Sequence, residues 1–228
     1  MTTPYFTAET LAFLSKLAKN NRRDWFEQHK SVYETCVRGP ALAFIADIAD
    51  ELAVISPHFM AQPKKLGGSL MRVHRDIRFA RDKTPYKTNI GIQFRHERGK
   101  DVHAPGFYLH ISPLECFLGV GLWRPESRVL GVLRDALLAH STKWLAVRNE
   151  KNFTSIFSLS GSSLQRAPRG YAADHPLIED LKRKDFIAIS ALTQEQVLGA
   201  RFRELVISRF RVADHFMQFL CTALNLQY

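Results

Sequence analysis

The sequence predicts an α+β protein, an antiparallel sheet flanked by N-terminal and C-terminal helices. Apolar residues recur at helical spacing over the first 56 residues, alternate with polar residues between residues 64 and 124, and return to helical spacing after residue 126. Helices followed by a run of strands and then by more helices are typical of this fold class. Because the 228 residues contain no repeat and no low-complexity linker, we expect a single domain over residues 1–228.

Three amphipathic helices are expected in the N-terminal segment, over about residues 7–21, 24–39 and 40–56. Pro40 suits the first turn of the third helix, where its missing N–H is not needed. The dipeptide Ser56-Pro57 is expected to end that helix.

Strict alternation predicts three strands at residues 90–96, 107–111 and 116–122. The connections are short, so the strands are expected to form an antiparallel meander around residues 70–123. Glycines at 119 and 121 fall on one face of the third strand. Glycine within a strand most often marks a bulge, and sometimes the close approach of a backbone or a ligand.

The remainder is expected to be helical with short strands. Helices are predicted at about residues 129–140, from 141, and at 175–181, with one or two short strands near a turn at 161–163. A strand at residues 186–189 should be followed by a turn at Thr193 and by one long final helix from about Ala200.

Composition places the chain among soluble globular proteins, with 46% hydrophobic and 24% charged residues. The three cysteines (Cys36, Cys116 and Cys221) are far apart, which predicts buried free thiols in a reducing cytoplasm. We expect no signal peptide, because the N-terminus has no basic region followed by an apolar one. No membrane partner is expected, because no apolar run approaches the ~20 residues that span a bilayer.

No metal and no cofactor are expected. His96, His103 and His110 lie near one another in a predicted hairpin, but no HExxH motif or carboxylate at ligand spacing accompanies them. We therefore interpret them as unrelated strand or turn residues.

The positive charge is concentrated in one stretch. Between Lys64 and Lys100, eleven Lys/Arg face three Asp/Glu, which accounts for +8 of the net +10. From Arg72 to Lys87, six Lys/Arg face two Asp, and bulky apolar residues are interspersed, so this segment is expected to be ordered. A concentrated positive field predicts an anionic partner.

The candidate site follows from this stretch and the neighbouring strands. The expected anion contacts are Arg72, Arg75, Arg78, Lys83, Lys87, Tyr86 and Arg124. The expected orienting or acid–base groups are Asp76, Asp82, Gln93 and His110. Arginine's planar fork suits phosphate and carboxylate, so the favoured ligand is a small phosphate- or carboxylate-bearing molecule.

Two alternatives remain open. Arg75, Asp76, Arg78 and Asp82 are also able to form a purely structural ion-pair network. A nucleic-acid-binding or protein-interaction module would use the same positive charge without chemistry. Whether the protein is an enzyme is left open, with His110 or Tyr86 as the acid–base candidates.

Several motifs resemble a known family. They are RDIRF (75–79), DKTPYKTN (82–89), GFYLHISP (106–113), GVGLWRPE (119–126) and NRRDWF (21–26). Together they resemble the bacterial and fungal family known as domain of unknown function 2461. The resemblance implies a single α+β domain with no assigned reaction, and it carries no catalytic roles onto these residues.

Overall fold

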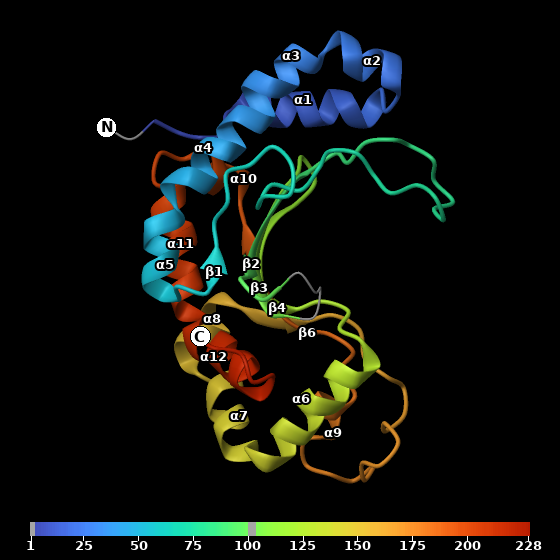
Figure 1. Ribbon diagram of the computed structural model, residues 1–228, viewed down its shortest axis with the longest axis vertical. Helices are drawn as coiled ribbons and strands as arrows, with labels where there is room; N and C mark the ends of the chain where they lie inside the picture. The colour runs from blue at the N-terminus through green and yellow to red at the C-terminus, as the bar shows by residue number, and fades with distance from the viewer. Residues whose placement is uncertain (1–2, 100–103) are drawn as a thin grey trace.

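The computed structural model describes residues 3–99 and 104–228, and Figure 1 shows its course. Within these residues, one six-stranded sheet has the order β1-β2-β3-β4-β6-β5, with every neighbouring pair antiparallel. The strands are β1 (Phe59–Met60), β2 (Ile90–His96), β3 (Gly106–Ile111), β4 (Cys116–Leu122), β5 (Ser158–Ser160) and β6 (Phe186–Leu192). His103 lies outside the described residues.

Helices occupy both ends of the chain, so the predicted α+β class is confirmed. Those before the sheet are α1 (Ala8–Lys19), α2 (Arg23–Gln28), α3 (Lys30–Tyr33), the π-helix η1 (Glu34–Arg38), α4 (Gly39–Asp47) and α5 (Ala49–Ile55). Those after β4 are α6 (Ser127–Ala139), α7 (Ser141–Arg148), α8 (Lys151–Ile156), α9 (Ile178–Leu181), α10 (Gln194–Leu198), α11 (Phe202–Val212) and α12 (Asp214–Ala223).

Three predicted helices are divided in the structure. The second is split into α2, α3 and η1, the third breaks at Ile48, and the long final helix breaks at Ala213. The last break has a packing reason. Phe210 of α11 packs on Phe107 of β3 with ring centroids 4.6 Å apart, whereas Phe216 of α12 packs on Trp144 at 6.0 Å. A change of direction at Ala213 allows both contacts.

The core lies between the helices and one face of the sheet. Alternate residues such as Phe94, Phe107, Leu109 and Leu118 are fully buried, and Figure 1 shows α4, α5 and α11 on this side. Burying large apolar side chains contributes roughly 1.5–3 kcal/mol each, so this layer holds the sheet in place.

The opposite side, which we call the open face, carries the other set of alternating residues. Its central positions are Gln93 of β2, Tyr108 and His110 of β3, and Phe117 and Gly119 of β4. These residues are all partly exposed. In Figure 1 the curved sheet presents this side to the space between the chain after β1 and the region of α6 and α9.

The structure explains why β4 has a glycine at position 121. Its φ is +108°, and a Cβ there would lie 2.1 Å from the carbonyl oxygen of Phe186 on the neighbouring strand. Only glycine tolerates both conditions. Its role is therefore close backbone approach within the sheet.

Two further expectations are tested by the fold. The cysteines are free thiols, with Cys116 and Cys221 buried but Cys36 only partly so. Within residues 3–99 and 104–228, no helix is both long and apolar enough to cross a membrane.

Candidate functional site

The basic stretch forms an arm, which we call the basic hairpin (Arg72–Lys87). Its two sides are joined where the Lys87 N–H donates to Val73 O at 2.7 Å and the Arg75 N–H donates to Pro85 O at 2.8 Å. At its base, the Met71 N–H donates to Gly91 O of β2 at 2.9 Å. The basic hairpin therefore projects from the sheet at the beginning of β2.

The N-terminal helices clamp the hairpin. The Tyr86 ring is 3% exposed and stacks on Phe26 of α2 with centroids 4.1 Å apart. The Asn21 amide donates to Tyr86 O at 2.9 Å and accepts from the Tyr86 N–H at 3.0 Å. Tyr86 is thus a packing residue, and burial raises its pKa. The expectation that it contacts a ligand or moves a proton does not fit this position.

Asp82 organises the hairpin tip. It accepts from the Thr84 N–H at 2.9 Å and pairs with the Arg75 guanidinium at 2.5 Å, while Arg75 also bonds the Thr84 hydroxyl. The backbone bond from Thr84, and then the bond from Arg75, lower the pKa of Asp82 to about 2. Arg75 is therefore held inside the hairpin.

Arg78 is paired in the same way. Its Nε and Nη2 donate to the two oxygens of Asp76 at 3.0 and 2.7 Å, and this fork lowers the pKa of Asp76 to about 2. Lys83 Nζ donates to Ile77 O at 2.9 Å. Asp76 and Asp82 thus each pair with an arginine, and the arginines' donors are directed to the hairpin itself.

Three cations of the hairpin have no hydrogen-bond or ion-pair partner among the described residues: Arg72, Arg81 and Lys87. The charge of Arg72 does contribute to lowering the pKa of Asp76. Arg72 and Arg81 are exposed, whereas Lys87 is half-buried. Burial, and then repulsion by nearby Arg72, lower the pKa of Lys87. Neighbouring side chains of an extended segment point to opposite sides. Because Tyr86 points to α2, Lys87 points away from the helices.

His110 is the centre of the open face. Its ring stacks on Phe117 with centroids 4.7 Å apart and planes 6° apart. Its Nδ1 lies 3.2 Å from Tyr108 Oη and 3.4 Å from Asn89 Nδ2. Since an amide nitrogen only donates, we assign Nδ1 as the acceptor and place the proton of the neutral ring on Nε2. Nε2 lies 4.0 Å from Glu115 Oε1.

Partial burial shifts the pKa values of Tyr108 and His110 in opposite directions. Burial lowers the pKa of His110 and raises the pKa of Tyr108 to about 12, so both are neutral at pH 7. Gly91 makes the arrangement possible, because a Cβ there would lie 2.9 Å from Tyr108 Oη. The pair can accept or donate hydrogen bonds, and it is able to transfer a proton.

The structure also corrects the placement of Arg124. Ile90, the first residue of β2 after the basic hairpin, pairs with Ile111, which pairs with Cys116, so these residues define the end of the sheet nearest that hairpin. Arg124 follows Leu122 at the opposite end. There its side chain lies over Trp123, 4.8 Å from the ring centroid. Arg124 is thus at the end of the sheet away from the basic hairpin, and we do not include it in the site proposed below. Gln93 does lie on the open face, where Oε1 accepts from Arg95 Nε at 3.1 Å.

A family model described as "Conserved hypothetical protein (DUF2461)" matches residues 9–219. The chain belongs to this family. A search of the curated proteins and a search of the solved structures each found no match. The DUF2461 match spans both the basic hairpin and the open face, and its description names no reaction.

Sequence reasoning on this DUF2461 member missed Asn21 and Phe117. A signal existed for Phe117, because a four-residue turn at residues 112–115 sets His110 opposite it. For Asn21 no signal existed, since its partner Tyr86 lies 65 residues away. His96 is on the other side of the sheet, where its Nε2 bonds Gln227 O at 2.9 Å.

Proposed function

We propose that the protein binds a small phosphate- or carboxylate-bearing molecule between Arg72, Lys87 and the open face. The observation that carries this proposal is the state of Lys87, a half-buried ammonium with a lowered pKa and no counter-ion among the described residues. A cation removed from water and left unpaired is costly. An anion seated against it would offset that cost.

Two cations side by side support the same proposal. Arg72 repels Lys87 in the free protein, and an anion between them would convert this repulsion into two attractions. Arg75 and Arg78 take another role here. Their bonds to Asp82 and Asp76 make the hairpin rigid, so that Lys87 is presented in a fixed position without the entropy loss of ordering a loop on binding.

The Tyr108–His110 pair supplies the polar recognition. In the assigned tautomer, Nε2–H of His110 is a donor without a hydrogen-bond acceptor among the described residues, since Glu115 Oε1 is 4.0 Å away, a distance too long for a hydrogen bond. A ligand oxygen would satisfy it. If the ligand undergoes chemistry, this imidazole is the group positioned to move a proton, because its pKa lies below 6.5 and the ring is neutral at pH 7.

The test is calorimetric titration of inorganic phosphate, nucleotides and polycarboxylates into the wild-type protein and matched variants. Lys87→Met and Arg72→Gln are expected to weaken binding at least tenfold. Arg81→Gln removes the same charge from an exposed residue of the hairpin, and it is expected to change affinity less than twofold. Equal losses in all three variants would mean general electrostatic attraction and would contradict a discrete site.

One observation favours nucleic acid as the alternative partner. Phe79 is 95% exposed at the hairpin tip, and Arg78 lies 6.0 Å from its ring centroid. Exposed aromatic rings among cations stack on single-stranded bases. For such a partner, Phe79→Ser and Arg81→Gln would weaken binding most, and affinity would fall linearly with salt on logarithmic axes. A small-molecule site should be insensitive to Phe79→Ser.

A further inference from the structure

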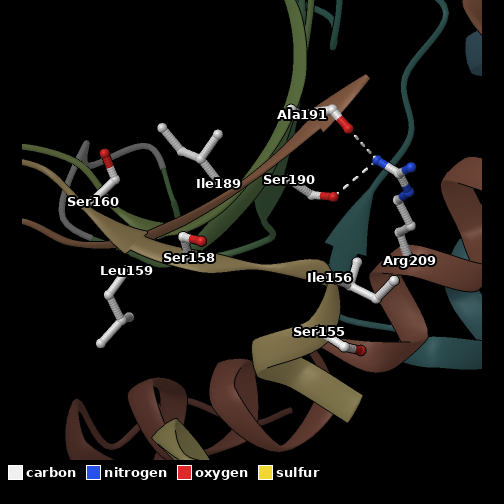
Figure 2. A pocket seen from close by; sticks show the side chains of 9 residues that line it. All are labelled: Ser155, Ile156, Ser158, Leu159, Ser160, Ile189, Ser190, Ala191 and Arg209. Carbon is white, nitrogen blue, oxygen red and sulfur yellow. Dashed lines mark hydrogen bonds between the residues drawn. The ribbon is translucent and has the colours of Figure 1, made fainter. Parts of the chain in front are cut away.

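A second site lies at the opposite edge of the sheet, where a shallow cavity of about 520 Å³ opens beside β5. Figure 2 shows it between the end of α8, the edge strand β5, the strand β6 and α11. Its lining residues are Ser155, Ile156, Ser158, Leu159, Ser160, Ile189, Ser190, Ala191 and Arg209. Four serines and one arginine contribute polar groups to this wall.

Arg209 is fixed within the cavity. Figure 2 shows its side chain reaching from α11 to β6, where Nη1 donates to Ser190 Oγ at 2.9 Å and to Ala191 O at 2.5 Å. Strand β5 pairs with β6 only from Ile187 to Ile189. The guanidinium therefore occupies the edge of β6 just beyond the last paired residue, and its orientation is set before any ligand arrives.

The charge of Arg209 is not compensated by the protein. Burial lowers its pKa, and no carboxylate among the described residues pairs with it. Its Nε and Nη2 also have no acceptor within that part of the chain. Arg75 and Arg78 of the basic hairpin, by contrast, each have a carboxylate partner. A half-buried guanidinium with free donors is a site of strong attraction for an oxyanion.

The hydroxyl groups extend the site along β5. Ser158 and Ser160 pair with Ile189 and Ile187, so their side chains lie on the same face of the sheet as those isoleucines and opposite to Ser190. Their hydroxyls have no protein partner among the described residues. Ile156, 37% exposed, adds an apolar wall beside Arg209. The cavity thus combines one fixed cation, free hydroxyl donors and a small apolar surface, a combination typical of small-molecule sites.

We propose that this cavity binds a small polar molecule through its phosphate or carboxylate group, with Arg209 as the anion contact. The site is separate from the basic hairpin, because β5 and β2 lie on opposite sides of the central strands of the sheet. The two sites can therefore be tested with different variants, and either proposal can fail alone.

The experiment follows the Nε–Hε NMR signal of Arg209 during titration with inorganic phosphate and, in a parallel arm, with succinate. We expect a saturable shift with at least one probe, and the stronger probe distinguishes a tetrahedral from a planar anion. The signal is assigned from its absence in Arg209→Gln. Arg211→Gln removes an exposed cation of the same helix and is expected to leave the affinity within twofold.

A variant that fills the cavity carries the decisive comparison, since Arg209→Gln also removes two hydrogen bonds to β6. Ser158→Phe leaves those bonds intact and is expected to weaken probe binding at least tenfold without lowering Tm by more than about 2 °C. Either of two results overturns the proposal: no saturable shift with either probe, or a saturable shift that Ser158→Phe leaves unchanged.

Discussion

The clamp between Asn21 and Tyr86 leads to a quantitative prediction. In Asn21→Ala, the hairpin loses the two hydrogen bonds of 2.9 and 3.0 Å that hold the Tyr86 backbone. Each such bond contributes about 1 kcal/mol net, and a buried group left without a partner costs about 1–3 kcal/mol. Because Tyr86 is only 3% exposed, water replaces these partners poorly. The expected loss in the free energy of unfolding is about 2–3 kcal/mol.

The assay is urea unfolding, with the slope m expected to remain that of wild type because the exposed area on unfolding does not change. Asn20→Ala is the matched control. Asn20 makes one exposed bond, to Lys16 O at 2.9 Å, so its loss should cost less than about 1 kcal/mol. The stacking of Tyr86 on Phe26 involves neither substituted side chain and is expected to persist in both variants. If Asn21→Ala costs no more than Asn20→Ala, the clamp does not hold the hairpin as described.

Three further predictions follow from the same contacts. Gly121→Ala should lower the free energy of unfolding by more than about 2 kcal/mol, since φ is +108° and the new Cβ would meet Phe186 O at 2.1 Å. Gly131→Ala in α6, with open space around it, should instead raise the free energy of unfolding, measured with urea, by about 0.5–1 kcal/mol. The pKa of His110 should lie below 6.5 in an NMR titration. Its unfolded state then binds more protons, so stability should fall as the pH drops through 6.5, and His110→Asn should remove that part of the pH dependence. Asp180→Ala should cost about 3–5 kcal/mol, because the 1% exposed carboxylate pairs with Arg148 and Arg183; Glu179→Ala, on an exposed pair, should cost less than about 1 kcal/mol.

The sheet was the part most accessible from sequence. The expected strand at residues 90–96 coincides with β2, and the other two meander strands agree within one residue. Period-two alternation is unambiguous when short polar turns bound it. The predicted antiparallel order also implies the position of Arg124, because β4 begins at the end of the sheet near the basic hairpin and ends at the opposite one. That consequence of antiparallel pairing was missed.

Helix boundaries were less accessible, for two different reasons. The start of α10 had a signal, a Thr193–Gln196 capping box whose two bonds measure 3.0 and 3.1 Å, although only a turn was predicted there. The break at Ala213 had none, because it depends on where Phe107 and Trp144 lie in the folded core. Local spacing carries no record of such contacts.

The candidate site shows the same division. Composition identified the basic stretch, but the pairing of Arg75 with Asp82 depends on a turn at Thr84 that brings residues seven positions apart into contact. Such pairing determines which cations remain free. From sequence alone, Arg75, Arg78 and Lys87 are equal candidates for anion contact. In the structure Arg75 and Arg78 pair with carboxylates, whereas Lys87 has no such pair among the described residues. For Arg209, nothing in the local sequence indicates that its side chain reaches β6.

The most direct test of the proposed function is the pKa of the Lys87 ammonium, measured by NMR titration of its Cε signal with and without saturating phosphate. The free protein should show a pKa below 10.5, because burial and Arg72 disfavour the charged form. Phosphate should raise it, since a bound anion stabilises that form, and Arg81→Gln should leave both values unchanged. A pKa at or above 10.5 in the free protein, or one that phosphate does not move, would contradict an unpaired cation at the centre of an anion site.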